Sequence, residues 1–372
     1  MKKRVVVILG LLVVLCLIVY GLVKTKEGAN AEFEEPNVVI EPKVIRISAV
    51  GDIMLGRYVA TLIKDNFDDP FNEVKEYFED SDIKFGNLEC VLSDTDLQNI
   101  KGKAKNFCLK GPSDMVNVLK TIGFNILSVA NNHIYDYGSD GLADTIHNLS
   151  ENGIEFIGAG ENLEEARRLK IIDVNEVRIG FLGYTDLAYV NFSDKNQIPA
   201  ASDVKSGVAP LNKEYIIEDI NNAQGECDLL FVSLHWSDEY THIPKNSQVE
   251  LAHELIDAGV DGILGHHAHN LQGVEIYKNK PIIYNMGNFI FDQNDNLNKD
   301  SAIFNLTFTD GIFTALEIIP CRIEGKKKVV LAKDSDCQRI LEHINKFSQI
   351  FDTKFVEKDS KLFIENSDNN LQ

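Results

Sequence analysis

The sequence has few basic residues and few cysteines, and each shortage excludes a class of protein. Its 372 residues include 37 lysines and arginines against 57 acidic residues, which gives a formal net charge of −20. We therefore expect no nucleic-acid partner, because phosphate binding needs a basic surface. The six cysteines include no C-x-x-C pair. This argues against a thiolate zinc site and against a disulfide-rich scaffold.

The N-terminus contains a long hydrophobic run without a charge. Lys2, Lys3 and Arg4 precede it, and it covers residues 5–23. A helix of this length would span roughly 28 Å, close to the thickness of the hydrocarbon core of a membrane. The basic cluster predicts that the short tail stays in the cytoplasm. We expect one transmembrane signal-anchor at the cell membrane, with the bulk of the chain extracellular. The alternative is a cleaved signal peptide.

The rest of the chain divides into a linker, a large domain and an extension. Residues 24–43 are polar with two prolines and read as a linker between membrane and domain. From residue 44, strand-like runs alternate with amphipathic helical segments, which is typical of an α/β fold. Later strand-like runs follow one another directly and indicate antiparallel pairs in a second sheet. We assign residues 44–325 to the domain and residues 326–372 to a charged, helical extension.

Residues that can bind metals follow five of the predicted strands. They are Asp52; Asn87 and Glu89; Asn131, Asn132 and His133; His235; and His266, His267 and His269. Because ligands bind at the carboxyl ends of strands in open α/β sheets, these distant residues are expected to meet at one edge. Imidazole, carboxylate and amide ligands suit manganese, zinc or iron. The set exceeds the needs of one tetrahedral ion, so we expect two divalent ions.

Each of these residues also has an ordinary structural explanation when it is taken alone. Asp52 could cap a helix, Glu89 could be a surface or capping residue, and Asn131 could form a turn. His133 or His235 could be a hydrogen-bonded histidine of the core. Five such coincidences, all at strand ends, explain the pattern less well than one shared site.

Six blocks of the sequence resemble the CapA/PgsA family of poly-γ-glutamate capsule biosynthesis proteins. They are VGDIMLGR (50–57), GNLE (86–89), VANNHIYDYGSDGL (129–142), HWSDEY (235–240), GHHAHNLQGVEIY (265–277) and YNMGNFIFDQ (284–293). The resemblance implies the fold of calcineurin-like metallophosphoesterases. That fold is a four-layer α/β/β/α sandwich with a two-metal site.

The resemblance also implies roles for single residues. The metal ligands would be Asp52, Glu89, Asn132, His235, His267 and His269. Asp52 would be shared by the two ions, and His133 and Asp52 would be catalytic. The residues expected to contact the substrate or to support the ligands are Asn87, Asn131 and His266. Met54 stands where the phosphoesterases have a histidine, which removes one ligand.

The resemblance favours a role in capsule assembly over any particular reaction. We expect a membrane-anchored protein that takes part in the synthesis or export of poly-γ-glutamate, beside membrane-embedded synthase subunits. The alternative is a metal-dependent hydrolase that cuts a phosphoester or a γ-glutamyl amide outside the membrane. The polymer and the chain are both negatively charged. Metal ions or a basic patch would have to offset their repulsion, and the candidate patch is Lys101, Lys103, Lys105 and Lys110.

Overall fold

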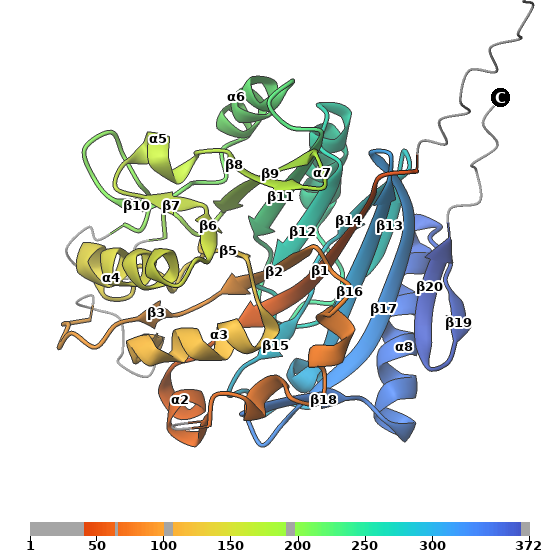
Figure 1. Cartoon of the computed structure of the whole chain (residues 1–372), viewed down its shortest axis with the longest axis horizontal. Helices are drawn as coiled ribbons and strands as arrows, with labels where there is room; N and C mark the ends of the chain where they lie inside the picture. The colour runs from red at the N-terminus through yellow and green to blue at the C-terminus, as the bar shows by residue number, and fades with distance from the viewer. Residues whose placement is uncertain (1–40, 64–65, 100–106, 191–197, 366–372) are drawn as a thin grey trace, which may run out of the picture. The chain divides into compact units, whose positions relative to one another are not determined.

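Two β-sheets form the centre of the structure, a computed structural model that describes residues 41–63, 66–99, 107–190 and 198–365 (Figure 1). One sheet has ten strands, with the order β19-β20-β17-β16-β1-β2-β5-β6, and β15 and β18 pair with β1 and β17. The other has six strands in the order β13-β14-β12-β11-β9-β8. The predicted transmembrane segment, residues 5–23, lies outside the described residues. Within the described ranges, no helix is long and apolar enough to cross a membrane.

The ten-stranded sheet combines a parallel half and an antiparallel half. Its parallel strands are β1 (Val44–Ile53), β2 (Ile83–Leu88), β5 (Ile126–Ser128), β6 (Glu155–Ile157) and the short β15 (Asn288–Ile290). Its antiparallel strands are β16 (Asp300–Thr309), β17 (Ile312–Glu324), β18 (Lys328–Leu331), β19 (Val356–Lys358) and β20 (Lys361–Glu365). The antiparallel pairs expected late in the chain are thus present, but most of them extend the first sheet.

The six-stranded sheet is parallel at its centre and antiparallel at both edges. The central strands are β9 (Val177–Thr185), β11 (Leu229–His235), β12 (Gly262–His266) and β14 (Lys280–Ile283). The edge strands are β8 (Lys170–Val174) and β13 (Val274–Tyr277). Two small ribbons pair β3 (Val91–Leu92) with β4 (Lys110–Gly111) and β7 (Ala159–Gly160) with β10 (Gly207–Val208).

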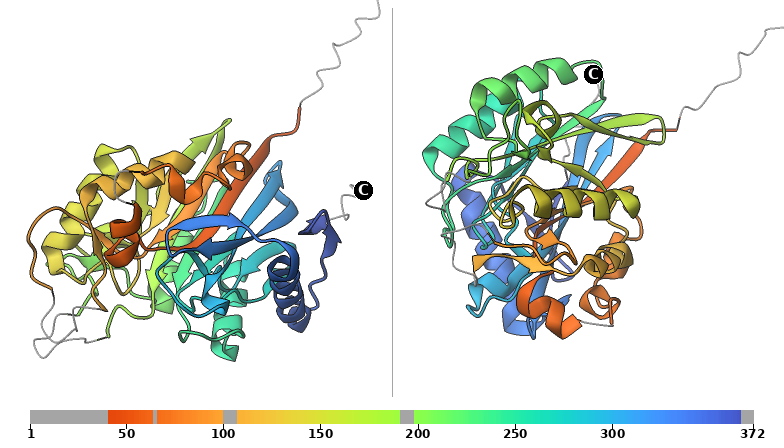
Figure 2. Two further views of the ribbon diagram at one scale, coloured as in Figure 1. Left: turned by 90° about the horizontal axis from the view of Figure 1, so that it is seen from below. Right: turned by 90° about the vertical axis from the view of Figure 1, so that its left-hand side faces the viewer.

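Helices cover the outer face of each sheet, and the α/β class expected from the sequence is confirmed (Figure 2). The helices are α2 (Arg57–Ile63), α3 (Val116–Ile122), α4 (Gly138–Glu151), α5 (Leu163–Ala166), α6 (Lys213–Ala223), α7 (Asn246–Asp257) and α8 (Asp334–Ser348). The buried side chains of α3 and α4 pack on the ten-stranded sheet, and those of α6 and α7 pack on the six-stranded sheet. The order of layers is therefore helix, sheet, sheet, helix.

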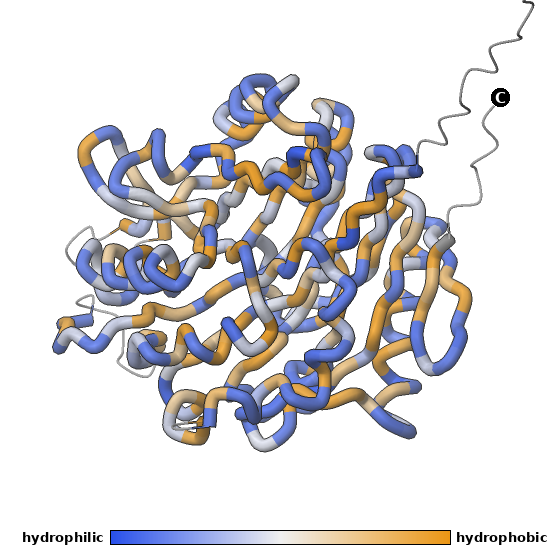
Figure 3. Tube along the Cα trace, viewed as in Figure 1, coloured by the Kyte–Doolittle hydropathy of each residue, from blue (hydrophilic) through white to orange (hydrophobic). Residues whose placement is uncertain are grey.

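The alternation of side chains along β11 shows why the sheets stack in this way. Phe231 lies in the core between the sheets, whereas its neighbours Leu230 and Val232 pack with α6 and α7. Phe181 stacks between Phe231 and Phe85, with ring centroids 5.5 and 6.0 Å away. Because successive side chains of a strand point to opposite faces, a strand that is hydrophobic at every position must be covered on both sides. The central strands carry much of the hydrophobic colour in Figure 3.

Gly51 allows the end of β1 to run against a neighbouring backbone. A Cβ atom at this position would lie 1.9 Å from the carbonyl oxygen of Gly287. The next residue, Asp52, donates its backbone N–H to that same oxygen at 2.9 Å and is in register with Asn288 of β15. The close approach fixes where the Asp52 side chain leaves the sheet.

Residues 326–365 are part of the main unit of the structure, which begins at Lys43. Strands β18 and β20 pair with β17, and the apolar face of α8 joins the core between the sheets through Ile340, Leu341 and Ile344. His343, on the same helix, donates from Nε2 to the carbonyl oxygen of Leu271 at 2.8 Å. Its ring lies 4.7 Å from that of His242.

The docking of α8 should make stability depend on pH through His343. Burial lowers the pKa of His343 to about 4, although its bond to the Leu271 carbonyl acts in the opposite direction. His242, Lys346 and Arg339 face it and lower that pKa further. The ordinary pKa is 6.5, so the unfolded chain takes up the proton first. We expect the free energy of unfolding to fall, by at most roughly 3 kcal/mol from this group, between about pH 6.5 and pH 4.

The measurement is urea unfolding across this range of pH. His343→Gln should show a smaller fall than the unchanged protein, whereas a change at the exposed His147 should leave the fall as it was. Identical pH profiles for the unchanged protein and His343→Gln would contradict the expectation.

Candidate metal centre

The register of the strands brings the predicted metal ligands to one place. Asp52 of β1 pairs with Asn87 of β2, and Asn87 pairs with Ser128 of β5. In the other sheet, His235 of β11 pairs with His266 of β12. These strands run parallel within each sheet, so their carboxyl ends share one edge. The centre lies where the edges of the two sheets meet.

Two groups of possible ligands share one carboxylate. The first, the His235 group, consists of Glu89, His235 and His267. The second, the Asp52 group, consists of Asp52, Glu89 and His269. Within each group, the ligand atoms lie within 4.8 Å of one another. All five residues are buried. Glu89 Oε1 lies 3.9 Å from Nε2 of His235 and 3.9 Å from Nε2 of His269. Glu89 thus belongs to both groups and Asp52 to one, and the expectation that two ions share Asp52 stays a prediction.

Asn132 and His133 flank the His235 side of the centre. The Asn132 side-chain oxygen accepts a hydrogen bond from His235 Nε2 at 2.9 Å, so an amide oxygen is available beside that imidazole. His133 Nε2 lies 3.9 Å from Glu89 Oε1. Its other ring nitrogen, Nδ1, lies 2.8 Å from Oδ2 of Asp136, a buried carboxylate that also accepts from the Leu109 N–H at 2.8 Å.

A chain of two amides fixes the carboxylates. Asn131 Nδ2 donates to Asn87 Oδ1 at 3.0 Å, and Asn131 Oδ1 accepts from the backbone N–H of His133 at 3.0 Å. Because the Asn87 oxygen is engaged, its Nδ2 points the other way and donates to Asp52 Oδ1 at 2.8 Å. The same nitrogen lies 3.5 Å from Glu89 Oε2. Asn87 therefore contacts both carboxylates, and Asn131 holds Asn87 in place; their roles beside bound ions stay predictions.

Asn288 sets the orientation of the His269 ring. Its Oδ1 accepts from His269 Nδ1 at 2.9 Å, and its Nδ2 donates to the carbonyl oxygen of Asn298 at 2.9 Å. With the proton on Nδ1, the Nε2 lone pair is available on the side of Glu89.

His266 belongs to neither group. Its Nδ1 lies 3.3 Å from Asp52 Oδ1, and its ring packs near Phe85.

The charges of Asp52, His235 and His267 suit metal binding, whereas His269 differs: burial by itself lowers its pKa, but the hydrogen bond to Asp52 raises it. Burial by itself raises the pKa of Asp52, but His266 and His269 hold that pKa well below its usual range. Burial, with the neighbouring His267, lowers the pKa of His235 far below its usual range. Burial also lowers the pKa of His267 to about 3. At neutral pH, Asp52 is therefore charged, and both of these imidazoles are neutral.

These residues fit a divalent metal ion. The buried Nδ1 of His267 has no hydrogen-bond partner among the described residues. Two carboxylates, Asp52 and Glu89, are fully buried, and burial of anions without a compensating cation is costly. Carboxylate oxygen, imidazole nitrogen and amide oxygen together suit zinc, manganese or iron. The expectation of two ions stays a prediction.

Met54 takes no part in the centre. It is fully buried in the core next to α2 and α3, and its sulfur accepts from the N–H of Gly56 at 3.2 Å.

Sequence reasoning assigned no role to Asp136, Asn288 and Glu239, although all three lie inside the six blocks. Asp136 carried a usable signal, because it follows His133 by three residues in a turn.

Several residues around the centre have a left-handed backbone. Arg57, Ser237, Tyr240, His267 and His269 have φ values of 48°, 99°, 64°, 91° and 57°. Residues other than glycine rarely adopt such values outside tight turns. Strained backbone of this kind persists only where the surrounding contacts enforce it, and it concentrates at functional sites.

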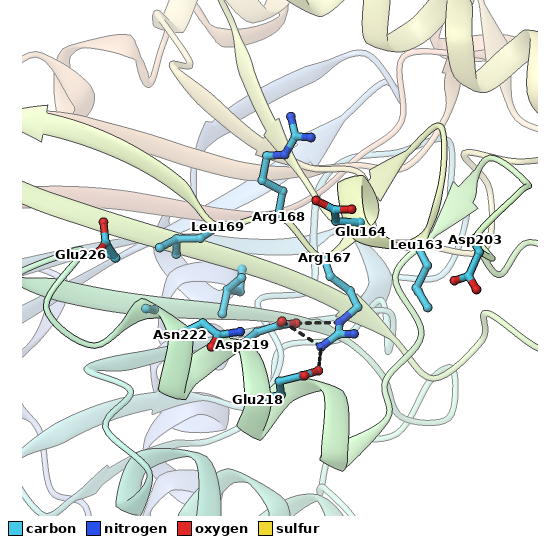
Figure 4. Close-up of a pocket in the computed structure, with 12 residues that line it drawn as sticks. Leu163, Glu164, Arg167, Arg168, Leu169, Asp203, Glu218, Asp219, Asn222 and Glu226 are labelled. Carbon is cyan, nitrogen blue, oxygen red and sulfur yellow. Dashed lines mark hydrogen bonds and ion pairs between the residues drawn. The ribbon is translucent and has the colours of Figure 1, made fainter.

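A separate pocket lies between α5 and α6 and has a volume of about 520 Å³ (Figure 4). Arg167 in its wall bonds to Asp219 at 2.9 Å and to Glu218 at 2.6 Å. The wall also carries the carboxylates of Glu164, Asp203 and Glu226. Because the guanidinium is already neutralised, this pocket is a poor site for an anionic polymer. It shares no residue with the centre.

Comparisons with known proteins agree on one family. The family described as bacterial capsule synthesis protein PGA_cap matches residues 46–293. Capsule biosynthesis protein CapA of Bacillus anthracis is 34% identical over 362 residues, which are 95% of this chain and 85% of the relative. PGA biosynthesis protein CapA of Bacillus subtilis is 35% identical over 300 residues, which are 80% of this chain and 77% of the relative.

A solved structure described as a novel phosphatase of Mycoplasma pneumoniae is also similar. It is 15% identical with a TM-score of 0.48, and the match covers 81% of this chain and 98% of that chain.

The role of Asn288 can be tested through metal affinity. Asn288→Ala removes the acceptor for His269 Nδ1, so the ring loses its fixed orientation. We expect metal affinity to fall by about 10- to 100-fold, as is usual when the partner of a ligand is lost. Titration with Mn²⁺ measures it. Asn305→Ala is the matched control, because this asparagine bonds to Ser48 and Glu317, remote from the centre. Equal losses in both variants would mean that Asn288 acts only through general stability.

Proposed function

Because the chain belongs to the bacterial capsule synthesis protein family, we propose that it takes part in the synthesis or export of poly-γ-glutamate through a divalent-metal centre. One observation carries this proposal. The family match over residues 46–293 includes the whole centre, from Asp52 to Asn288. The candidate ligands therefore lie inside the part of the chain that defines the family.

Charge supports a role for the metal in polymer binding. Poly-γ-glutamate is a polyanion, and this chain has a net charge of −20, so the two repel each other at long range. Lys101, Lys103 and Lys105 of the candidate basic patch lie outside the described residues, and Lys110 bonds to the Thr95 carbonyl oxygen at 2.6 Å. Divalent ions at the centre would supply local positive charge and take carboxylate oxygens as ligands.

We further propose that the hydrophobic run of residues 5–23 anchors the protein in the cell membrane. The order of a basic cluster and then 19 uncharged residues supports this. Such an anchor would hold the metal centre at the outer surface, beside the point where a membrane-embedded synthase delivers the polymer.

A metal-dependent hydrolase is the second candidate, and the His133–Asp136 pair favours it. Divalent ions at such a centre lower the pKa of bound water and stabilise developing negative charge. His133 is partly exposed, with 12% of its side chain accessible, so a substrate can reach it. Asp136 at 2.8 Å from Nδ1 would stabilise the protonated ring, which can then donate the Nε2 proton to a leaving group.

The metal centre can be tested by metal analysis of the full-length protein. We expect Mn²⁺, zinc or iron to bind in the unchanged protein and in His253→Ala, but with strongly reduced affinity in His267→Ala. His253 is a suitable control because its Nε2 bonds to Glu275, outside the ligand groups. Each variant should also be supplied to a capsule-forming cell that lacks its own copy. Restored polymer in cells with His267→Ala would contradict a role for the metal in assembly.

The hydrolase candidate can be tested with the variant Asp136→Asn. A screen of phosphodiester and γ-glutamyl amide substrates comes first. If one is turned over, Asp136→Asn should lower kcat by about 100-fold with little change in KM, because proton transfer by a positioned histidine contributes this much. Bound metal without turnover on any substrate would leave assembly as the function. Turnover unchanged in Asp136→Asn would exclude Asp136 as a residue that supports proton donation by His133.

A further inference from the structure

A third group of possible ligands lies on the solvent side of the centre. Glu239, His267 and His269 have ligand atoms within 4.8 Å of one another. Glu239 is exposed, whereas Glu89, which shares the other groups with these two histidines, is fully buried. The histidine pair thus has a carboxylate on its buried side and another on its open side.

The segment that carries Glu239 is tied to the centre at both ends. Before it, Trp236 donates its backbone N–H to the carbonyl oxygen of His266 at 3.2 Å. After it, Tyr240 donates to the carbonyl oxygen of Ala268 at 2.8 Å. The left-handed backbone at Ser237 and Tyr240 shapes the segment between these ties. An exposed glutamate on an unattached loop would have no defined position. These two hydrogen bonds instead hold the backbone on either side of Glu239 against residues 266–268.

The two inner groups differ in what stands beside them. The amide oxygen of Asn132 lies 2.9 Å from His235 Nε2, next to the group of Glu89, His235 and His267. The Asp52 group has three ligands among the described residues. Met54 adds none, since its sulfur accepts from Gly56 in the core. Among the described histidines, cysteines and acidic residues, none joins Asp52, Glu89 and His269 as a fourth member of their group, and Glu239 lies within reach of His269.

We propose that Glu239 is an exchangeable fourth ligand of the ion held by Asp52, Glu89 and His269. An exposed carboxylate beside a buried three-ligand group can bind the ion when the site is empty of substrate. A carboxylate of the substrate takes its place, since the two are the same chemical group. The inference rests on the proposed metal centre and narrows its substrate to a carboxylate-bearing molecule.

The first test is a Mn²⁺ titration of the full-length protein. Glu239→Gln should bind one ion as the unchanged protein does and the other at least about tenfold more weakly, because loss of even a residue that supports a ligand costs about 10- to 100-fold in metal affinity. Asp238→Asn is the matched control. It removes the same charge from the neighbouring exposed residue, which pairs with Lys245 at 2.8 Å. Affinity in this control should stay within about twofold. Thermal unfolding without metal should be the same in all three proteins, because Glu239 is exposed.

The second test uses glutarate as a carboxylate probe at saturating Mn²⁺. Glu239→Gln should bind glutarate more tightly than the unchanged protein, because no internal carboxylate competes for the ion. Equal Mn²⁺ affinity in Glu239→Gln and the unchanged protein would overturn Glu239 as a ligand. Unchanged glutarate affinity would overturn the exchange. Failure of the unchanged protein to bind Mn²⁺ at all would instead overturn the proposed metal centre, and this inference with it.

Discussion

The contact between the Asn87 amide and the two buried carboxylates is the interaction on which the centre depends. Asp52 and Glu89 are both fully buried, and two anions so close together repel each other strongly in a medium of low dielectric constant. Asn87 Nδ2, at 2.8 Å from Asp52 and 3.5 Å from Glu89, supplies a dipole that favours both charges. Asn131 prevents the amide from turning over, because it donates to the Asn87 oxygen. His266 and His269 also favour the charge of Asp52.

The pairing of the strands around Asp52 and Glu89 explains how the candidate ligands are held in place. Parallel register places Asp52 beside Asn87, and the absence of a side chain at Gly51 lets Asn288 approach from the other side. Asn288 in turn orients His269. The positions of the ligands are therefore determined by backbone pairing, while their protonation is determined by burial and by neighbouring amides. Left-handed backbone at His267 and His269 is the conformational cost of turning both rings towards the same place.

Much of the fold and most of the candidate ligands could be predicted from the sequence, since strand ends and residue types are local features. The six blocks pointed to the correct family, and the residues after β1, β2, β5, β11 and β12 do come together. The position of Glu89 near three histidines could not be predicted, because these distances are defined only by the packing of the two sheets. Asn288 and Glu239 were missed for the same reason. An asparagine that accepts from a histidine 19 residues away leaves no periodic trace in the sequence.

The two halves of the centre come from different sheets, and this has a mechanical consequence. Asp52, Glu89 and Asn132 leave the ten-stranded sheet, whereas His235, His267 and His269 leave the six-stranded one. The core between the two sheets is otherwise hydrophobic, and hydrophobic contacts are not directional. Divalent cations bound at the proposed centre would be held by ligands from both sheets, and they would therefore oppose movement of one sheet relative to the other.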